Sequence, residues 1–177
     1  ARAAVAPVIS HDNAGHLAAR LAQVLTIPEV LHALGIAEHP DRVPVETADG
    51  AVFELARVAS WREVAWYAPS EIVPRHRAKP GLAYWNDWLP AEKTLYFKYN
   101  RCADDAAAGM TFAQLVERTL AFMKTKPVER FVLDLRDNGG GDSRIAAPLI
   151  EALAAHPTLN ARGRLFVLIG RDTFSSA

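Results

Sequence analysis

Two short stretches near the carboxyl end of the chain carry residue types that could do chemistry. Residues 137–141 contain three successive glycines, which permit positive φ and leave backbone N–H groups uncovered, so a nest for an anion or oxyanion can form. Residues 173–176 end in two adjacent serines behind an apolar run, and a serine on a sharp turn after a strand can present its hydroxyl outward. Alone, each pattern has an ordinary explanation, because glycine-rich turns and helix-capping serines are common.

The pair becomes more informative once the surrounding elements are considered. Residues 131–135 and 164–169 are near-continuous apolar runs typical of buried parallel strands, and residues 94–99 predict a further strand. Amphipathic helices are expected over residues 111–124 and 145–155. This alternation predicts a layered α/β domain with a largely parallel sheet. Loops at the carboxyl ends of neighbouring parallel strands converge on one edge, so we expect the glycines and the serines to face each other.

A nucleophilic hydroxyl opposite uncovered backbone amides is the arrangement that acyl transfer requires. The hydroxyl attacks a carbonyl carbon, and the amides stabilise the negative charge that develops on the carbonyl oxygen. Loss of one such donor typically slows a reaction about 10²–10³-fold. The glycines would therefore matter for catalysis as well as for the turn.

Other chemistries lack support in the sequence. The glycine loop has neither the Lys–Ser/Thr pair of a phosphate-binding loop nor the spaced glycines of a dinucleotide site. Asp137 has no partner at metal-ligand spacing, and the single cysteine, Cys102, excludes an intrachain disulfide. Basic and acidic residues balance at 20 each, and no apolar run approaches the ~20 residues of a membrane span. The sequence thus predicts no cofactor, no metal, no nucleic-acid partner and no transmembrane segment.

The front half predicts a smaller α+β region. A helix capped by Ser10 or Asp12 should run to about Leu25, and Thr26 should open a second helix that stops at Gly35. A hairpin is expected from the strand-like residues 43–46 and 52–55 on either side of an Asp-Gly turn. Residues 60–90 are expected to be irregular, with tryptophans that cover the core or, alternatively, form a substrate-binding surface: Trp61, Trp66, Trp85 and Trp88.

Three segments of the chain resemble the tail-specific (C-terminal processing) serine peptidases. Residues 131–141 resemble the "DLR-x-N-x-GG" segment of that family, and residues 165–177 look like a "TFSSA" variant of its nucleophile segment, commonly "TASAS". Residues 94–100 are similar to the strand that opens the family's catalytic domain. The match covers residues 94–177, nearly half of the chain.

The resemblance implies a crotonase- and ClpP-like core and assigns roles to four residues. Ser175 falls on the nucleophile, and Ser176 on the next residue, whose N–H helps to form the oxyanion hole. Gly140 falls on the other oxyanion donor, with Gly139 next in line. Ser176 as the nucleophile is the one-residue alternative. The resemblance further implies a polypeptide substrate and an extracytoplasmic location, whereas oligomeric state is not readable.

The chain departs from the family pattern in two respects. The usual base is a lysine roughly two dozen residues beyond the serine, and the chain ends first, so this fragment is expected to be inactive. Some relatives use a histidine instead, but none of the six histidines lies in a telling motif. Residues 93–177 would then be the front part of the catalytic core, preceded by residues 1–92 as a degenerate PDZ-like domain or a family-specific cap.

Two alternatives to a peptidase remain at the level of sequence. Interphotoreceptor retinoid-binding protein resembles the same family, so the same core could carry a retinoid or fatty acid without catalysis. A crotonase-like acyl-CoA enzyme would use the same oxyanion chemistry but would not need the Thr-Phe-Ser-Ser segment of residues 173–176.

Overall fold

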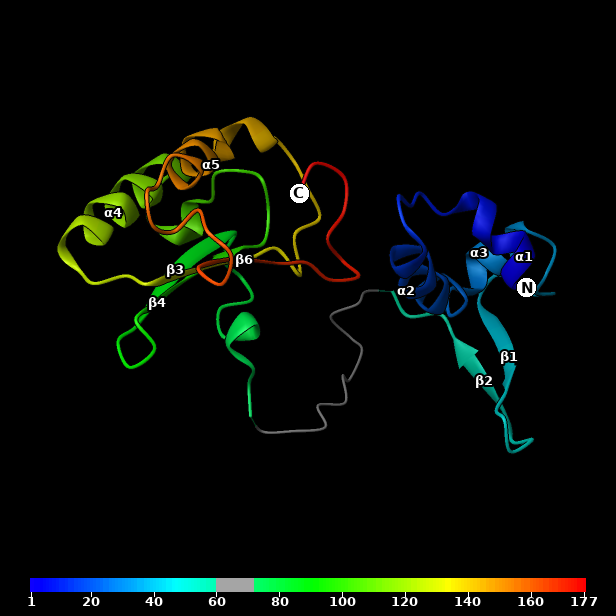
Figure 1. The fold of residues 1–177 in the computed structure, drawn as a ribbon. Coiled ribbons are helices and arrows are strands. Elements are labelled where there is room, and N and C mark those ends of the chain that lie inside the picture. Colours follow the sequence, from blue (N-terminus) through cyan, green and yellow to red (C-terminus); the bar gives the residue numbers. More distant parts are fainter. Residues whose placement is uncertain (60–71) are drawn as a thin grey trace. The chain divides into compact units, whose positions relative to one another are not determined.

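The computed structural model describes residues 1–59 and 72–177 (Figure 1). The chain divides into two compact units, Ala1–Glu71 and Ile72–Ala177. The boundary that we expected after residue 92 therefore falls inside the second unit. The reason is a strand at Tyr84–Leu89 (β3), which pairs along its whole length with the strand Thr94–Tyr99 (β4).

The first unit combines helices with one hairpin, as expected for a small α+β region. Its elements are α1 (Arg2–Val5), η1 (Ala6–Val8), α2 (Ala14–Val24), α3 (Pro28–Ala33), β1 (Arg42–Glu46) and β2 (Val52–Ala56). The strands β1 and β2 pair antiparallel around Gly50, whose φ of 85° suits the tight turn. The helices and the hairpin share a core built around Val5, Leu21, Leu31 and Val43.

The helix caps in this unit differ from the sequence prediction. Asn13, rather than Ser10 or Asp12, caps α2, because its side chain accepts a hydrogen bond from the His16 amide at 2.8 Å. The helix α3 begins at Pro28 behind Ile27 and has no side-chain cap. The expected cap, Thr26, instead donates its hydroxyl to the carbonyl of Gln23, the residue before the end of α2.

The second unit is a mixed sheet with helices packed on it. Its elements are η3 (Arg75–Arg77), β3 (Tyr84–Leu89), β4 (Thr94–Tyr99), η4 (Ala106–Ala108), α4 (Phe112–Thr125), β5 (Arg130–Asp134), η5 (Ser143–Ala146), α5 (Ala147–Ala154) and β6 (Leu165–Leu168). The sheet has the order β3-β4-β5-β6; β3 is antiparallel to β4, while β4–β5 and β5–β6 are parallel. A largely parallel α/β sheet is thus confirmed.

The helices α4 and α5 lie on the same side of this sheet (Figure 1). The reciprocal capping box of Thr111 and Gln114 defines the start of α4, one residue into the range that periodicity predicts. Beneath the helices, Phe97, Phe112 and Phe131 are completely buried, and Phe97 contacts both other rings. This core holds the strands that lead into the two candidate loops.

The strand β3 was missed because it lies in the stretch expected to be irregular. Its Trp85 is buried against Tyr96, and Trp88 packs edge-on against Phe122 of α4. Trp88 thus covers the core and Trp85 is buried, which agrees with the first of the two interpretations. Trp61 and Trp66 lie outside the described residues. No helix in residues 1–59 or 72–177 is both long enough and apolar enough to cross a bilayer.

Candidate active site

The two loops singled out in the sequence lie side by side where β5 and β6 end. The amide of Phe174 donates to the carbonyl of Asn138 at 2.9 Å, and the hydroxyl of Thr173 donates to the carbonyl of Leu135 at 2.7 Å. The same hydroxyl accepts the amide of Gly170 at 2.9 Å. Hydrogen bonds at several points thus join the glycine loop to the serine loop, and the expected convergence at one sheet edge is confirmed.

Gly140 touches the serine turn directly. Its φ is 94°, a conformation that L side chains rarely adopt. A Cβ built on Gly140 would lie 2.8 Å from the Cβ of Ser175 and 3.0 Å from the carbonyl oxygen of Phe174. The position therefore requires glycine for two independent reasons, backbone conformation and lack of space.

Ser175 is the serine whose hydroxyl is available. It is exposed, it has a φ of 61°, and its hydroxyl forms no hydrogen bond with any residue that the structure describes. A non-glycine residue in the left-handed region is uncommon and often marks a functional turn. The strained serine at a strand-end turn has the local geometry that presents a nucleophile.

Ser176 has a different environment. Its hydroxyl donates to the carbonyl of Gly141 at 2.6 Å and accepts the Gly141 amide at 3.1 Å. Both the donor and an acceptor position of this hydroxyl are therefore engaged with the glycine loop. Of the two candidate nucleophiles, Ser176 anchors the loops to each other and Ser175 is left free.

The backbone donors also differ from the expected set. The Gly140 amide, expected in the oxyanion hole, donates to Oδ1 of Asn138 at 2.8 Å. The amides of Gly139 and Ser176 find no acceptor within the described residues. Among the expected donors, the unpaired amides are therefore those of Ser176, which belongs to the expected donor pair, and of Gly139, the next residue in line.

Asn138 and Cys102 hold the glycine loop in place, and the sequence contains no local signal for either role. Asn138 is completely buried, and its Oδ1 accepts the Gly140 amide and lies 3.6 Å from the thiol of Cys102. Cys102 forms a parallel bridge with Gly141: its amide donates to the Gly140 carbonyl at 2.9 Å, and its carbonyl accepts the Asp142 amide at 2.7 Å. The buried cysteine is thus structural.

A buried group of charges supports the start of the same loop. Lys98 on β4 is completely buried and donates to Asp134 at 3.3 Å and to Asp137 at 2.8 Å. Asp134 at the end of β5 is also completely buried; it accepts the hydroxyl of Tyr96 at 2.6 Å and two guanidinium nitrogens of Arg136. Asp134 and Arg136 therefore support the start of the glycine loop.

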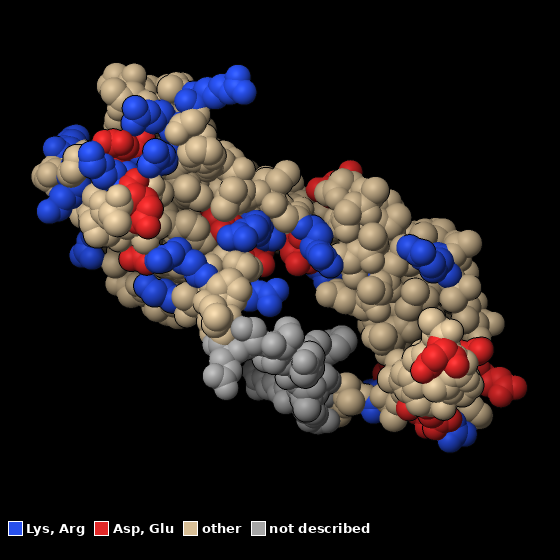
Figure 2. Space-filling model, turned by 60° about the horizontal axis from the view of Figure 1, so that its bottom comes forward, with Lys and Arg blue, Asp and Glu red and all other residues tan. Residues whose placement is uncertain are grey.

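These contacts shift the protonation equilibria of the cluster. Burial by itself raises the pKa of Asp134, but hydrogen bonds from Arg136 and Tyr96 and the charge of Lys98 outweigh it and hold that pKa well below its usual range. Burial and the neighbouring Asp134 carboxylate raise the pKa of Tyr96. Asp134 is therefore a carboxylate at neutral pH. At the surface of the second unit, acidic and basic side chains likewise lie next to each other (Figure 2).

No titratable side chain in the described part of the chain is hydrogen-bonded to the Ser175 hydroxyl. His76 lies on η3 next to Asp137, and His156 caps the turn after α5 by accepting the Leu159 amide at 3.2 Å. Neither ring is hydrogen-bonded to Ser175. Among residues 1–59 and 72–177, no cluster of His, Cys, Asp and Glu could hold a metal ion.

The comparisons with known proteins add no family assignment. No protein-family model matches the chain, and no curated protein matches it. The function must therefore be argued from the geometry of the two loops together with the sequence resemblance.

Proposed function

We propose that the protein is a serine peptidase of the tail-specific type and that Ser175 is its nucleophile. The observation that carries this proposal is the close approach of the glycine loop to the Ser175 turn: a Cβ built on Gly140 would lie only 2.8 Å from the Cβ of Ser175. Under this proposal the second unit belongs to a crotonase- and ClpP-like core, and the first unit is a degenerate PDZ-like domain or a family-specific cap. The substrate is a polypeptide, and the location is extracytoplasmic.

The proposed reaction is acyl transfer through a covalent intermediate. The Ser175 oxygen attacks the carbonyl carbon of a peptide bond while a base removes the hydroxyl proton, and the carbonyl oxygen becomes an oxyanion. The amides of Ser176 and Gly139, which have no acceptor among the described residues, are the proposed donors to that oxyanion. The tetrahedral intermediate then expels the amine with a proton, which leaves an acyl-enzyme for water to hydrolyse.

The base is the component that the described geometry does not identify, since no described residue is hydrogen-bonded to the Ser175 hydroxyl. A base is essential because a serine hydroxyl is a weak nucleophile at its ordinary pKa. The resemblance expects a lysine farther along the protein. Activity should therefore be tested on the full-length protein.

A fluorophosphonate probe tests the proposal directly. The probe should label the full-length protein, mass spectrometry should locate the adduct on Ser175, and Ser175→Ala should abolish labelling. Ser176→Ala should retain the adduct, because the Ser176 hydroxyl is used as a loop anchor. An adduct on Ser176 would reverse the two roles, whereas an unlabelled protein that binds retinoid or fatty acid would support a ligand carrier.

A further inference from the structure

The second unit contains a pocket beside the glycine loop that the proposed chemistry does not use. It has a volume of about 580 Å³ and is lined by residues 80–83, His76, Arg77, Asn100, Arg101 and Asp137. Ligand pockets commonly measure about 300–1,000 Å³, so this pocket can receive a large side chain together with part of its backbone.

The pocket lies at the same sheet edge as Ser175. Asn100 and Arg101 follow β4, and Asp137 follows β5, the strand that leads into the glycine loop. Asp137 precedes Gly140 by three residues, which span at most about 11 Å when extended, and Gly140 contacts Ser175. The pocket wall is therefore within about three residues of extended polypeptide of a bond held at Ser175.

The pocket is preformed, because hydrogen bonds tie its two walls together. The side chain of Asn100 donates to the Leu82 carbonyl at 2.8 Å, and the Asn100 amide donates to the Ala83 carbonyl at 2.7 Å. The Ala83 amide in turn donates to the carboxylate of Asp105 at 2.7 Å. A ligand therefore meets a rim whose backbone groups are already paired.

The charge in the pocket is positive once internal pairs are counted. The carboxylate of Asp137 is paired with the buried Lys98 at 2.8 Å. Arg101 has only a long contact of 3.8 Å with Asp105, and the exposed Arg77 forms no ion pair within the described residues. Burial, reinforced by the Arg136 charge, lowers the pKa of His76, so its imidazole is neutral at neutral pH. The unpaired guanidinium of Arg77 and the loosely paired one of Arg101 are the cations at the pocket that can receive an anion.

We propose that this pocket binds the carboxylate side chain of an Asp or Glu residue in the polypeptide substrate, about three residues from the bond at Ser175. Arg77 and Arg101 are then specificity-determining residues, because a guanidinium pairs with a carboxylate through two parallel hydrogen bonds. The inference rests on the proposed function for the position of the cleaved bond, whereas the selection of an acidic side chain rests on the pocket itself.

The test measures peptide binding to the full-length protein in a Ser175→Ala background, so that cleavage does not interfere. Fluorescein-labelled peptides with a single Glu moved along an otherwise uncharged sequence are compared by fluorescence anisotropy with matched Gln and Lys peptides. At one position, the Glu peptide should bind roughly tenfold more tightly than its Gln counterpart, as expected for a partly solvated charged hydrogen bond. The double variant Arg77→Gln/Arg101→Gln should bring the Glu peptide to the level of the Gln peptide.

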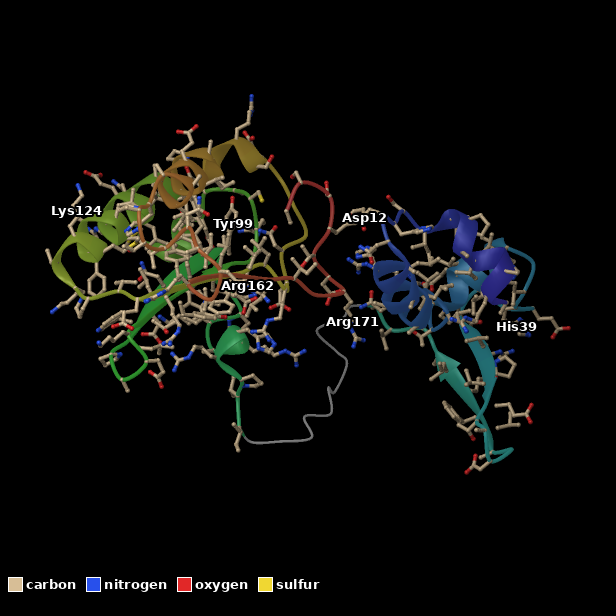
Figure 3. All side chains as sticks on the ribbon, viewed as in Figure 1. Asp12, His39, Tyr99, Lys124, Arg162 and Arg171 are labelled. Atoms are coloured by element: carbon tan, nitrogen blue, oxygen red, sulfur yellow. The ribbon has the colours of Figure 1, made fainter. Side chains whose placement is uncertain are left out.

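Lys124→Ala is the control for a loss of positive charge outside the pocket; it removes one charge from an exposed side chain, whereas the double variant removes two. Lys124 lies near the end of α4, far from the loop that carries Ser175 (Figure 3), so its removal should leave the preference for Glu intact. Unchanged binding of the Gln peptide to the double variant shows that the pocket still folds.

Equal binding of Glu and Gln peptides, tighter binding of the Lys peptide, or an equal loss in Lys124→Ala would overturn the inference. Fluorophosphonate labelling of the wild-type protein keeps the two proposals separate. Labelling of Ser175 without a Glu preference refutes the acidic pocket alone. A Glu preference without labelling refutes the peptidase mechanism and leaves an acidic-peptide site.

Discussion

Substitution of Gly140 by alanine tests the contact on which the candidate site depends. The new methyl group would lie 2.8 Å from the Ser175 Cβ and 3.1 Å from the Ser176 amide nitrogen, while the backbone stays at a φ of 94°. Holding an L residue in a sparsely populated conformation costs about 1–3 kcal/mol, and overpacking a tight contact costs about 1–3 kcal/mol more. We therefore expect the free energy of unfolding to fall by about 2–6 kcal/mol.

Two other glycines provide matched controls. A Cβ at Gly163 meets nothing within 4 Å although φ is 78°, so Gly163→Ala isolates backbone strain and should cost about 1–2 kcal/mol. A Cβ at Gly139 also meets nothing within 4 Å, and its φ is not in the left-handed region, so Gly139→Ala should be nearly neutral. Urea denaturation followed by tryptophan fluorescence measures all three variants in this chain.

In the full-length protein, the same variants should distinguish a loss of labelling caused by a displaced Ser175 turn from one caused by lower overall stability. Gly140→Ala should abolish fluorophosphonate labelling, because the methyl group displaces the Ser175 turn, whereas Gly163→Ala should retain it. If Gly140→Ala unfolds at the urea concentration of Gly139→Ala and labels at the wild-type rate, the two loops are not in contact and the site assignment fails.

Three further predictions follow from the buried groups. Asp134→Asn should lower the free energy of unfolding by about 3–5 kcal/mol at neutral pH. Hydrogen bonds from Arg136 outweigh burial and depress the Asp134 pKa in the folded state. The stability that the Asp134 carboxylate contributes is therefore complete above its unfolded pKa of about 3.9 and is lost as the pH falls below that value. Urea titrations at pH 7 and pH 3 should show that difference narrowing; an unchanged difference would count against the charge cluster. Phe131→Ala, at a completely buried ring, should cost about 3–5 kcal/mol by the same measurement, whereas Phe166→Ala, at a ring 41% exposed in this chain, should cost far less; equal losses would contradict the described core. The Cys102 thiol is 1% exposed, so a thiol reagent should modify it only after unfolding, and rapid modification in native buffer would contradict its position under the glycine loop.

The sequence alone predicts a structural element correctly where the residues that define the element lie close together in the chain. The strand Thr94–Tyr99 has the predicted bounds, and the reciprocal cap of Thr111 and Gln114 starts α4 within one residue of the predicted range. The convergence of the glycine and serine loops was also predictable, because the alternation of strands and helices implies parallel neighbours whose loops meet at one edge. These features follow from periodicity, capping and chain connectivity alone.

Contacts between distant residues were decided only by the tertiary structure. The strand β3 depends on pairing with β4, so its tryptophan-rich sequence reads as irregular when taken alone. The hydrogen bond from the Gly140 amide to Asn138 and the bonds between Ser176 and Gly141 change which amides and which hydroxyl are free. Motif spacing places Ser175 and Ser176 on the same turn, but hydrogen-bond competition across 35 residues of sequence separates their roles.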